Sequence, residues 1–277
     1  MPGPTGDDPI QQGRTGQGGS EQAQPEQSKT FYATYHFAEV EKPCAENGLD
    51  TSRAVKHFIR PKDAGSEKYS PPANREELES AFITQGWDPV KRLLFDQTIA
   101  VFDRNLTLSE LPAAQDALEQ AQVPQEQHEE VFEAATRKIR SKLQWAAEES
   151  IKNAGLHGNQ CDPSKFVEHI AGFSTDGNFL LWVKDDGLGY IPADIPPQWI
   201  DEQLQIATGR GLQTALGLMG NDNWTELWTK VCPGDWPSEL SPERYGTMRI
   251  FDQGAGIQFR FGWQRAILEA YSEIGAE

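Results

Sequence analysis

Residues 149–159 read ESIKNAGLHGN, and this stretch decides the fold prediction. Glu149, Asn153 and His157 recur every four residues, so a helix places their side chains on one face. Such a polar row is common on the solvent side of a helix. It also suits a metal or phosphate site, where a carboxylate, an amide oxygen and an imidazole converge. By itself, the row favours the solvent-facing interpretation.

The helix that holds this row is predicted to run from about residue 125 to residue 156. Pro124 precedes it, and Gly155 and Gly158 end it. The apolar residues that recur along it at helical spacing are Val131, Ala135, Ile139, Leu143, Ala147, Ile151 and Ala154. A long amphipathic helix of this kind needs a second layer that covers its apolar face.

Two strands are predicted directly after the helix, KFVEHIAGFS at 165–174 and NFLLWVKD at 178–185. The Asp176-Gly177 pair between them is a turn signal, so the strands form a hairpin. The second strand leads into VKDDGLGY at 183–190. Asp-Gly pairs are common in plain turns. Alternatively, such a segment places a carboxylate, Asp185, beside glycine backbone that a ligand can approach closely.

A third stretch, TGRGL at 208–212, opens a short helix predicted for residues 212–219. Glycines at a helix N-terminus leave N–H groups free for an anion such as phosphate. The same residues also suit a flexible loop that leads into a helix. The sequence contains no GxxxxGK[ST] phosphate loop.

The remaining segments are predicted from composition and periodicity. The expected strands are residues 31–40, one or two within 93–108, and then 224–230, 246–251 and 257–263. The expected helices are 75–84, a helix from an N-cap at Ser109 to about residue 122, and one ending near residue 274. Residues 41–75 are expected to be loop, with at most a short helix at 51–58. This order predicts an α+β fold, a two-layer α/β sandwich with a mostly antiparallel sheet.

Composition limits the function classes. The chain has 25 Lys and Arg against 42 Asp and Glu, a net charge of -17, which argues against binding to duplex nucleic acid or to an anionic membrane. Cys44, Cys161 and Cys232 form no CxxC pair, so a zinc site and a disulfide framework are not expected. Without an apolar stretch near 18 residues, the expected location is the cytoplasm.

The three stretches, taken together and in order, resemble the GHKL or histidine-kinase-like ATPase fold (the Bergerat ATP-binding fold), and within it the bacterial anti-sigma-factor serine/threonine kinases. The resemblance covers about residues 92–252 and includes an opening strand at 99–108 and a helix at 111–122. It implies an N-terminal extension of unknown role at 30–90, the ATP-binding domain at 91–265 and a C-terminal helix or tail at 266–277. Residues 1–29, rich in Gly, Gln, Pro and acids, are predicted from their composition to be a disordered tail.

The resemblance also implies a role for each matching residue. Glu149 matches the general base, Asn153 the Mg2+ ligand, and Asp185 the carboxylate that accepts the adenine amino proton. His157 closes the first stretch near the phosphates or the lid. The other residues implied to contact ATP are Gly187, Gly189, Gly209, Arg210, Gly211, Leu212 and Thr247. Leu188 and Tyr190 depart from the family, which commonly has Pro and Phe at these positions.

The function implied is an ATP- and Mg2+-dependent protein serine/threonine kinase. It would phosphorylate a small antagonist protein of the STAS type and sequester a sigma factor, and the resemblance allows a homodimer. An alternative is a nucleotide-gated protein-binding module with little or no kinase activity, which the long extension favours. Intact Glu149 favours the kinase, because a pure binder needs no base. A chaperone-type ATPase clamp is disfavoured by the short lid at 191–207.

Histidines outside the first stretch are expected to be structural or solvent-facing. His128 lies only 21 residues before Glu149 on the same predicted helix, too close for the separate phosphoacceptor helix of a histidine kinase, and is interpreted as an exposed helix residue. His36, His57 and His169 have no metal-ligand spacing. Trp236 lies in a Pro- and Trp-rich segment that suits either a core edge or a partner surface.

Overall fold

The computed structural model describes residues 32–35, 42–61, 69–187, 224–229, 247–250 and 254–275. Within these residues the helices are α1 (Lys42–Glu46), α2 (Arg75–Thr84), α3 (Trp87–Arg104), α4 (Pro112–Gln120), α5 (His128–Asn153) and α9 (Gln264–Ile274). The strands are β1 (Tyr32–Tyr35), β2 (Leu49–Pro61), β3 (Val167–Ser174), β4 (Phe179–Asp185), β5 (Trp224–Thr229), β6 (Thr247–Ile250) and β7 (Ala255–Phe261). Short helical turns are η1 (Leu108–Glu110), η2 (Gln125–Gln127) and the π-helical turn η3 (Ala154–Gly158).

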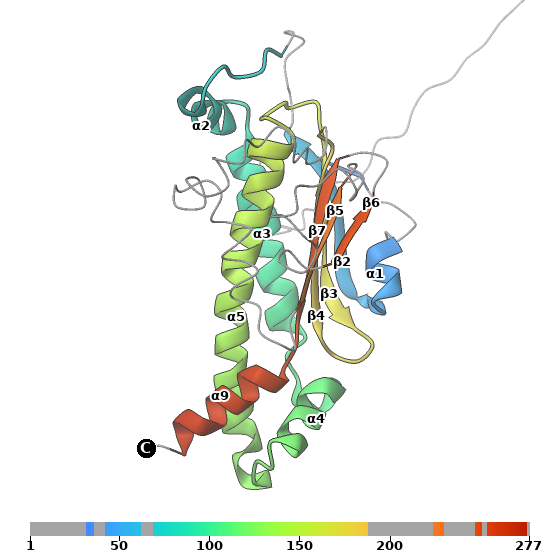
Figure 1. Ribbon diagram of the computed structural model, residues 1–277, viewed down its shortest axis with the longest axis vertical. Coiled ribbons are helices and arrows are strands. Elements are labelled where there is room, and N and C mark those ends of the chain that lie inside the picture. The colour runs from blue at the N-terminus through green and yellow to red at the C-terminus, as the bar shows by residue number, and fades with distance from the viewer. Residues whose placement is uncertain are drawn as a thin grey trace, which may run out of the picture. The chain divides into compact units, whose positions relative to one another are not determined.

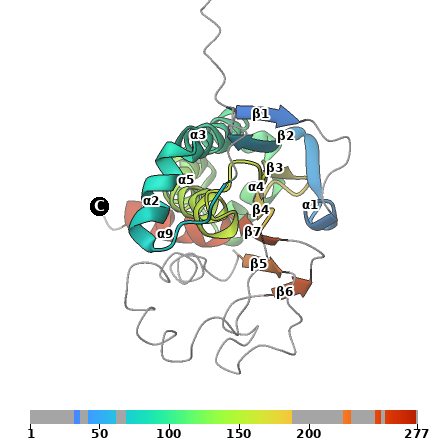
Figure 2. The ribbon, with the colours of Figure 1, turned by 90° about the horizontal axis from the view of Figure 1, so that it is seen from above.

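The described strands form one sheet in the order β1-β2-β3-β4-β7-β5-β6, seen from above in Figure 2. Neighbouring strands are antiparallel, apart from the parallel pair β5 and β6. β3 and β4 form the predicted hairpin, with Phe173 opposite Phe179. Gly177 in its turn has φ +87°, which favours glycine. The mostly antiparallel sheet of the prediction is confirmed.

Helices α3 and α5 pack on one face of the sheet, α3 against β2 and β3 and α5 against β4 and β7 (Figure 1). The short helix α1 lies on the opposite face (Figure 2), where Cys44 packs with Ile170 and Trp182. Between α3 and the sheet, the Phe102 ring meets Phe179 edge-on with centroids 5.3 Å apart. The predicted mixed α+β class, with an open sheet and helices, is confirmed.

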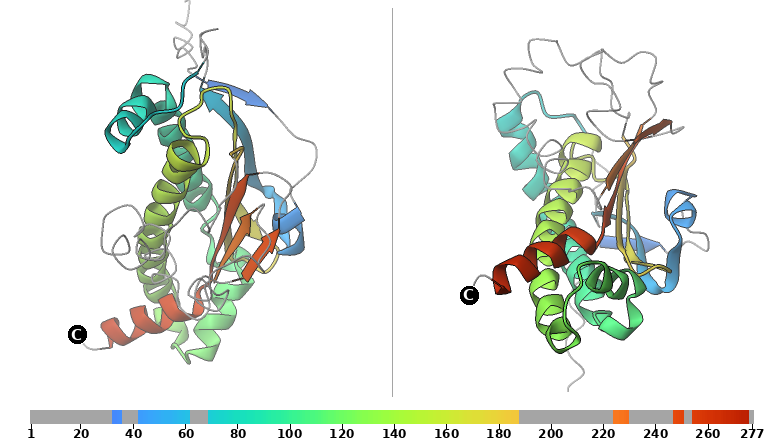
Figure 3. Two further views of the ribbon diagram at one scale, coloured as in Figure 1. Left: turned by 45° about the horizontal axis from the view of Figure 1, so that its top comes forward. Right: turned by 60° about the horizontal axis from the view of Figure 1, so that its bottom comes forward.

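The helix α9 closes one end of the helical layer. It packs on α4 and α5, and Figure 3 shows the three helices gathered at the same end of the sheet. Trp263, at the start of α9, donates its indole N–H to the Gly177 carbonyl at 2.9 Å and lies 5.1 Å from the Phe132 ring centroid on α5. One side chain therefore joins the β3–β4 turn, α5 and α9.

The interpretation of residues 41–75 as loop was wrong for 49–61, which form the strand β2. Val55 and Ile59 face the helical layer, and Ile59 is fully buried. Charged residues alternate with them on the other face, where they obscured the strand pattern. Arg60 there lies over the Phe166 ring, 4.9 Å from its centroid. Pairing with β1 and β3 decides the conformation.

The expectation of strands within residues 93–108 was also wrong, because α3 runs through most of this segment. Val90, Leu94, Val101 and Phe102 are buried at helical spacing, and the β-branched residues among them gave a misleading strand signal. The opening strand expected from the family resemblance at 99–108 is therefore helical as far as Arg104. Packing on the sheet outweighs intrinsic strand propensity here.

The helix expected after Ser109 exists, but it begins later. α4 starts at Pro112, the first helical residue, with Leu111 at the N-cap position, and Ser109 lies in the preceding turn η1. Proline at that position is favourable because its missing N–H would have no partner there. The long helix is confirmed as α5 followed by η3.

The expected boundary between extension and ATP-binding domain, at residues 90 and 91, falls inside α3. From the extension, β2 pairs with β3, with Ile59 opposite Val167. The described part of the extension thus belongs to the same sheet as the β3–β4 hairpin. Among the described residues, no helix has both the length and the apolar character needed to cross a membrane.

Candidate functional site

The end of β4 holds a buried carboxylate. Asp185 is 7% exposed, and its Oδ1 accepts hydrogen bonds from the Gly187 N–H at 2.9 Å and the Ala255 N–H at 3.2 Å. No residue in the described part of the chain donates a hydrogen bond to Oδ2. One carboxylate oxygen is thus held by backbone, and the other can accept a proton from a ligand.

Three glycines allow the backbone to approach this carboxylate. A Cβ on Gly158, the last residue of η3, would lie 2.3 Å from the Asp185 carboxylate. On Gly187 it would lie 2.0 Å from the Gly158 carbonyl oxygen, and on Gly254 it would lie 2.0 Å from the Asp185 carbonyl oxygen. Since such contacts are impossible for a real side chain, the end of α5, the end of β4 and the start of β7 converge only with glycine at all three positions.

Gly254→Ala is expected to lower the free energy of unfolding by about 3 kcal/mol, because the methyl group meets backbone and the residue has φ +74°. Gly275→Ala is the control, since its φ is -75° and its Cβ would contact only the Tyr271 carbonyl at 3.4 Å. Urea unfolding of both variants provides the measurement. Equal stability of the two would show that Gly254 is not required for this close approach.

The environment of Asp185 favours its protonated form. Its pKa is raised from 3.8 to about 6, mainly because the carboxylate is buried. The two backbone N–H groups and the nearby positive charge of Lys165 have the opposite effect and lower the pKa. The neighbouring Asp186 adds a smaller effect that raises the pKa. A strongly shifted acid beside closely packed glycine backbone is typical of a binding site, although structural networks also produce such shifts.

Asn159 connects the two stretches that meet at Asp185. Its side chain is fully buried, donates from Nδ2 to the Phe166 carbonyl at 3.0 Å, and accepts at Oδ1 from the Asp186 N–H at 2.9 Å. It therefore ties the end of α5 to the segments before β3 and after β4. The sequence prediction gave Asn159 no role, although it is the last letter of the ESIKNAGLHGN stretch.

The polar row lies along one flank of α5, next to its buried face. Glu149 and Asn153 are half-buried, and His157, in η3, is exposed. Within the described residues, no hydrogen bond or ion pair occupies the side chain of Glu149 or Asn153. Both oxygen-bearing groups are therefore available to a ligand along the helix that ends at Asp185.

The structure brings together part of the predicted site. Glu149, Asn153 and His157 lie on α5 and η3, and Asp185 and Gly187 lie beside the end of η3. The predicted site residues that lie outside the described residues are Gly189, Gly209, Arg210, Gly211 and Leu212. Leu188, Tyr190, His36 and Trp236 also lie outside them. The convergence of the first two stretches is visible, and the third is not described.

Thr247 does not lie beside Asp185 in the sheet. It begins β6, three strands from β4, a distance of about 14 Å across the sheet. It pairs with Glu226, which stands opposite Gln258 and hence level with Trp182, not with Asp185. Gly254 and Ala255 take the position next to Asp185. The DQGAG segment that contains them was interpreted only as a connection between strands.

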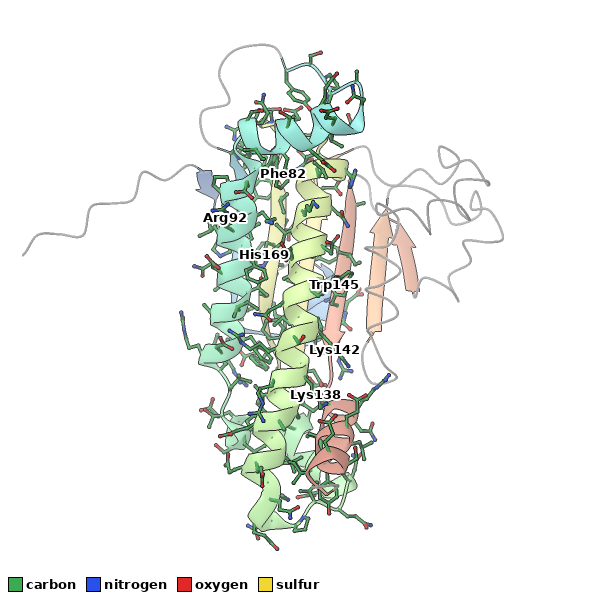
Figure 4. All side chains as sticks on the ribbon, turned by 90° about the vertical axis from the view of Figure 1, so that its left-hand side faces the viewer. Phe82, Arg92, Lys138, Lys142, Trp145 and His169 are labelled. Atoms are coloured by element: carbon green, nitrogen blue, oxygen red, sulfur yellow. The ribbon has the colours of Figure 1, made fainter. Side chains whose placement is uncertain are left out.

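Of the remaining histidines, His169 is structural, as expected. His169 is fully buried, and its Nε2 lies 2.7 Å from Thr98 Oγ1 on α3; Figure 4 shows His169 behind the helical layer. Burial and, to a lesser extent, nearby His57 lower its pKa to about 3, so it stays neutral. His128 differs from its prediction as exposed, because it is half-buried and its Nε2 lies 2.9 Å from the Val123 carbonyl.

The donor set fits a magnesium-bound nucleotide. Among the residues that the structure describes, His, Cys, Asp and Glu side chains form no cluster of three that could hold a metal by itself. Mg2+ at nucleotide sites needs few protein ligands, because phosphate and water oxygens complete its shell. The Asn153 amide oxygen suffices for such a role, and Asp185 Oδ2 provides an acceptor for an amino group.

In comparisons with models of known protein families and with curated proteins, the chain matched none.

Proposed function

We propose that the protein is an ATP-dependent protein serine/threonine kinase of the GHKL fold, resembling the anti-sigma-factor kinases. The observation that carries the proposal is the packing of Asp185 against Gly158 at the end of α5, the helix whose flank also presents Glu149 and Asn153. A base-binding carboxylate at the end of the helix, then a metal-binding amide and a general base on the helix itself, would thus follow one another in that order. An extended nucleoside triphosphate can span this arrangement.

Each side chain has one role in this proposal. Asp185 Oδ2 would accept the proton of the adenine amino group, while Oδ1 stays bonded to the Gly187 and Ala255 N–H groups. Asn153 would bind the metal ion through its amide oxygen. Glu149 would orient the attacking hydroxyl and accept its proton. When bound, ATP with Mg2+ supplies the phosphoryl group and neutralises charge during transfer.

The partners follow from the family resemblance alone. The protein substrate would be a small antagonist of the STAS type, and a sigma factor would be the sequestered partner. The test is direct: measure ATP affinity by calorimetry with and without Mg2+, then incubate the protein with radiolabelled ATP and candidate STAS proteins. Absence of ATP binding would refute the proposal, and transfer of label to a serine or threonine would support it.

A nucleotide-gated binding module with little or no kinase activity is the second candidate. The observation that favours it is the position of β2 from the N-terminal extension, which pairs with β3 beside the hairpin strand that ends in Asp185. Nucleotide binding at Asp185 would then affect the N-terminal extension through the hydrogen-bonded strands β4, β3 and β2, and the extension would bind the partner. ATP-dependent partner binding without any phosphate transfer would favour this candidate.

Asn153→Ala is expected to weaken ATP binding strongly in the presence of Mg2+ and only slightly in its absence, because the substitution removes a metal ligand. Asn153→Asp, which retains an oxygen at the same position, is the control and should preserve the effect of Mg2+. Calorimetric titrations in Mg2+ and in EDTA measure both. An equal loss of affinity in the two conditions would mean that Asn153 does not bind the metal.

A further inference from the structure

The polar row on α5 continues toward the N-terminal end of the helix. Lys138, Lys142 and Trp145 precede Glu149 and Asn153 at steps of four, three, four and four residues, so all five lie on one flank. All five are half-buried. Figure 4 shows Lys138, Lys142 and Trp145 in succession along α5, on the side that faces α9 and β7. We call this row the α5 flank.

The helix α9 engages only the first part of the α5 flank. Lys138 Nζ lies 2.7 Å from Glu273 Oε1 on α9. One turn further, Lys142 acts on Glu269 through its charge, while that carboxylate is bonded directly to Arg265 at 2.7 Å. Within the described residues, Lys142 forms no ion pair or hydrogen bond through its side chain. A positive charge thus stands at the edge of α9, followed along the flank by Trp145.

Trp145 lies between this charge and the proposed base. Its indole packs against the edge of the hydrophobic core and is only partly covered. Partly covered tryptophans are favoured at protein interfaces, where one ring face supplies a rigid apolar surface. The α5 flank therefore presents a cation, an aromatic surface and a carboxylate in succession, from Lys142, Trp145 and Glu149.

We propose that the acceptor segment of the protein substrate binds in extended form along the α5 flank, over Trp145, with an acidic side chain paired to Lys142. The proposal rests on the proposed function, because Glu149 marks where the accepting hydroxyl lies. Lys138 is already paired with Glu273, so Lys142 supplies the positive charge on the flank, on a chain with net charge -17. That charge complements an acidic side chain of the bound segment.

The spacing fixes the position of the acidic residue. Lys142 and Glu149 are seven helical residues apart, a rise of about 10 Å. A peptide extended in the polyproline II conformation covers that distance in about three residues, and side chains three positions apart then lie on the same side of it. The acidic residue is therefore expected three positions from the accepting serine or threonine, on one side of it only.

The test uses the full chain and nine-residue peptides with a central serine, in which a single Asp is moved through every other position. With ATP and Mg2+, kcat/KM is expected to be highest with Asp three residues from the serine, by about fivefold. Lys142→Ala should remove the preference, and Lys142→Glu should reverse it in favour of Lys at that position. Arg137→Ala, an exposed cation on α5 away from the flank, is the control and should change nothing.

A second measurement separates docking from catalysis. Fluorescently labelled peptides with Ala in place of the serine are titrated with the protein and a non-transferable ATP analogue, and their anisotropy reports binding. Lys142-dependent binding of these peptides, combined with no transfer to the matching serine peptides in the first assay, would support the docking surface and refute the kinase. Binding and transfer that do not depend on Asp position or on Lys142, or absence of peptide binding, would overturn this inference.

Discussion

Replacing Glu149 by Gln is expected to reduce phosphate transfer by about 100- to 10,000-fold and to leave ATP affinity largely intact. The amide keeps the size of the side chain and most of its hydrogen bonding, but it cannot accept the proton of the attacking hydroxyl. Glu149 is half-buried and makes no ion pair or hydrogen bond within the described residues, so the substitution breaks no contact there. The effect should therefore be catalytic, with the folded state preserved.

The adjacent residue provides a matched control. Glu148 carries the same side chain on the same helix, but it is exposed and pairs with Lys91 on α3 at 3.1 Å. Glu148→Gln should reduce transfer by less than about twofold, because it removes only an exposed ion pair to α3 that adds at most about 1 kcal/mol to folding stability. Calorimetry measures nucleotide affinity, and phosphate incorporation into the antagonist protein measures transfer. If wild type and Glu149→Gln are equally inert while ATP still controls partner binding in both, the binding module replaces the kinase.

The sequence predicted the elements whose local pattern agrees with their packing. The apolar spacing from Val131 onward identified α5, and Asp176-Gly177 identified the hairpin. It failed at α3 and β2, where local preference and tertiary packing disagree. Ile99 and Val101 favour a strand, yet they lie on a helix that packs on the sheet. In β2, the charged outer face hid an alternation that only its pairing partners reveal.

Local sequence likewise predicted only part of the candidate site. Residue type and spacing placed Glu149 and Asn153 on one helix and Asp185 at the end of a strand, and only the family resemblance predicted that these elements meet. Nothing in the local sequence indicated that Gly254 would approach the Asp185 carbonyl, because that contact joins residues far apart in the chain. Thr247 shows a related limit, since the order of strands places it three strands from β4, and Gly254 and Ala255 lie next to Asp185.

Asp185→Asn is expected to abolish detectable nucleotide binding and to preserve the fold. The Asn carbonyl can keep both hydrogen bonds from the Gly187 and Ala255 N–H groups. Its amide N–H2 then replaces Oδ2, so a donor faces the adenine amino group. An unpaired buried donor costs about 1–3 kcal/mol, and repulsion between the two amino groups adds to it. Calorimetry with ATP provides the measurement, and unchanged affinity would refute the assignment of Asp185 to the base.

The same variant tests whether the ionised Asp185 carboxylate destabilises the folded protein. Because its pKa is raised from 3.8 to about 6, ionisation costs stability as the pH rises through that interval. As the pH rises from about 4 to about 6, wild type should therefore lose about 3 kcal/mol of its free energy of unfolding relative to Asp185→Asn, and the difference should stay constant above that pH.

Asp176→Asn, at the turn of the same hairpin, is the control, and its difference from wild type should have the opposite sign. Bonds from Ser174 and Arg260 help to lower the pKa of Asp176, so its carboxylate adds stability that is lost as the pH falls. Urea unfolding from pH 4 to pH 8 compares the three proteins, and a pH-independent difference between Asp185→Asn and wild type would show that the carboxylate carries no such cost. Asp185→Asn could lose both the pH-dependent destabilisation and ATP binding. That result would mean that the Asp185 carboxylate lowers the stability of the fold and is needed as an acceptor for the ligand.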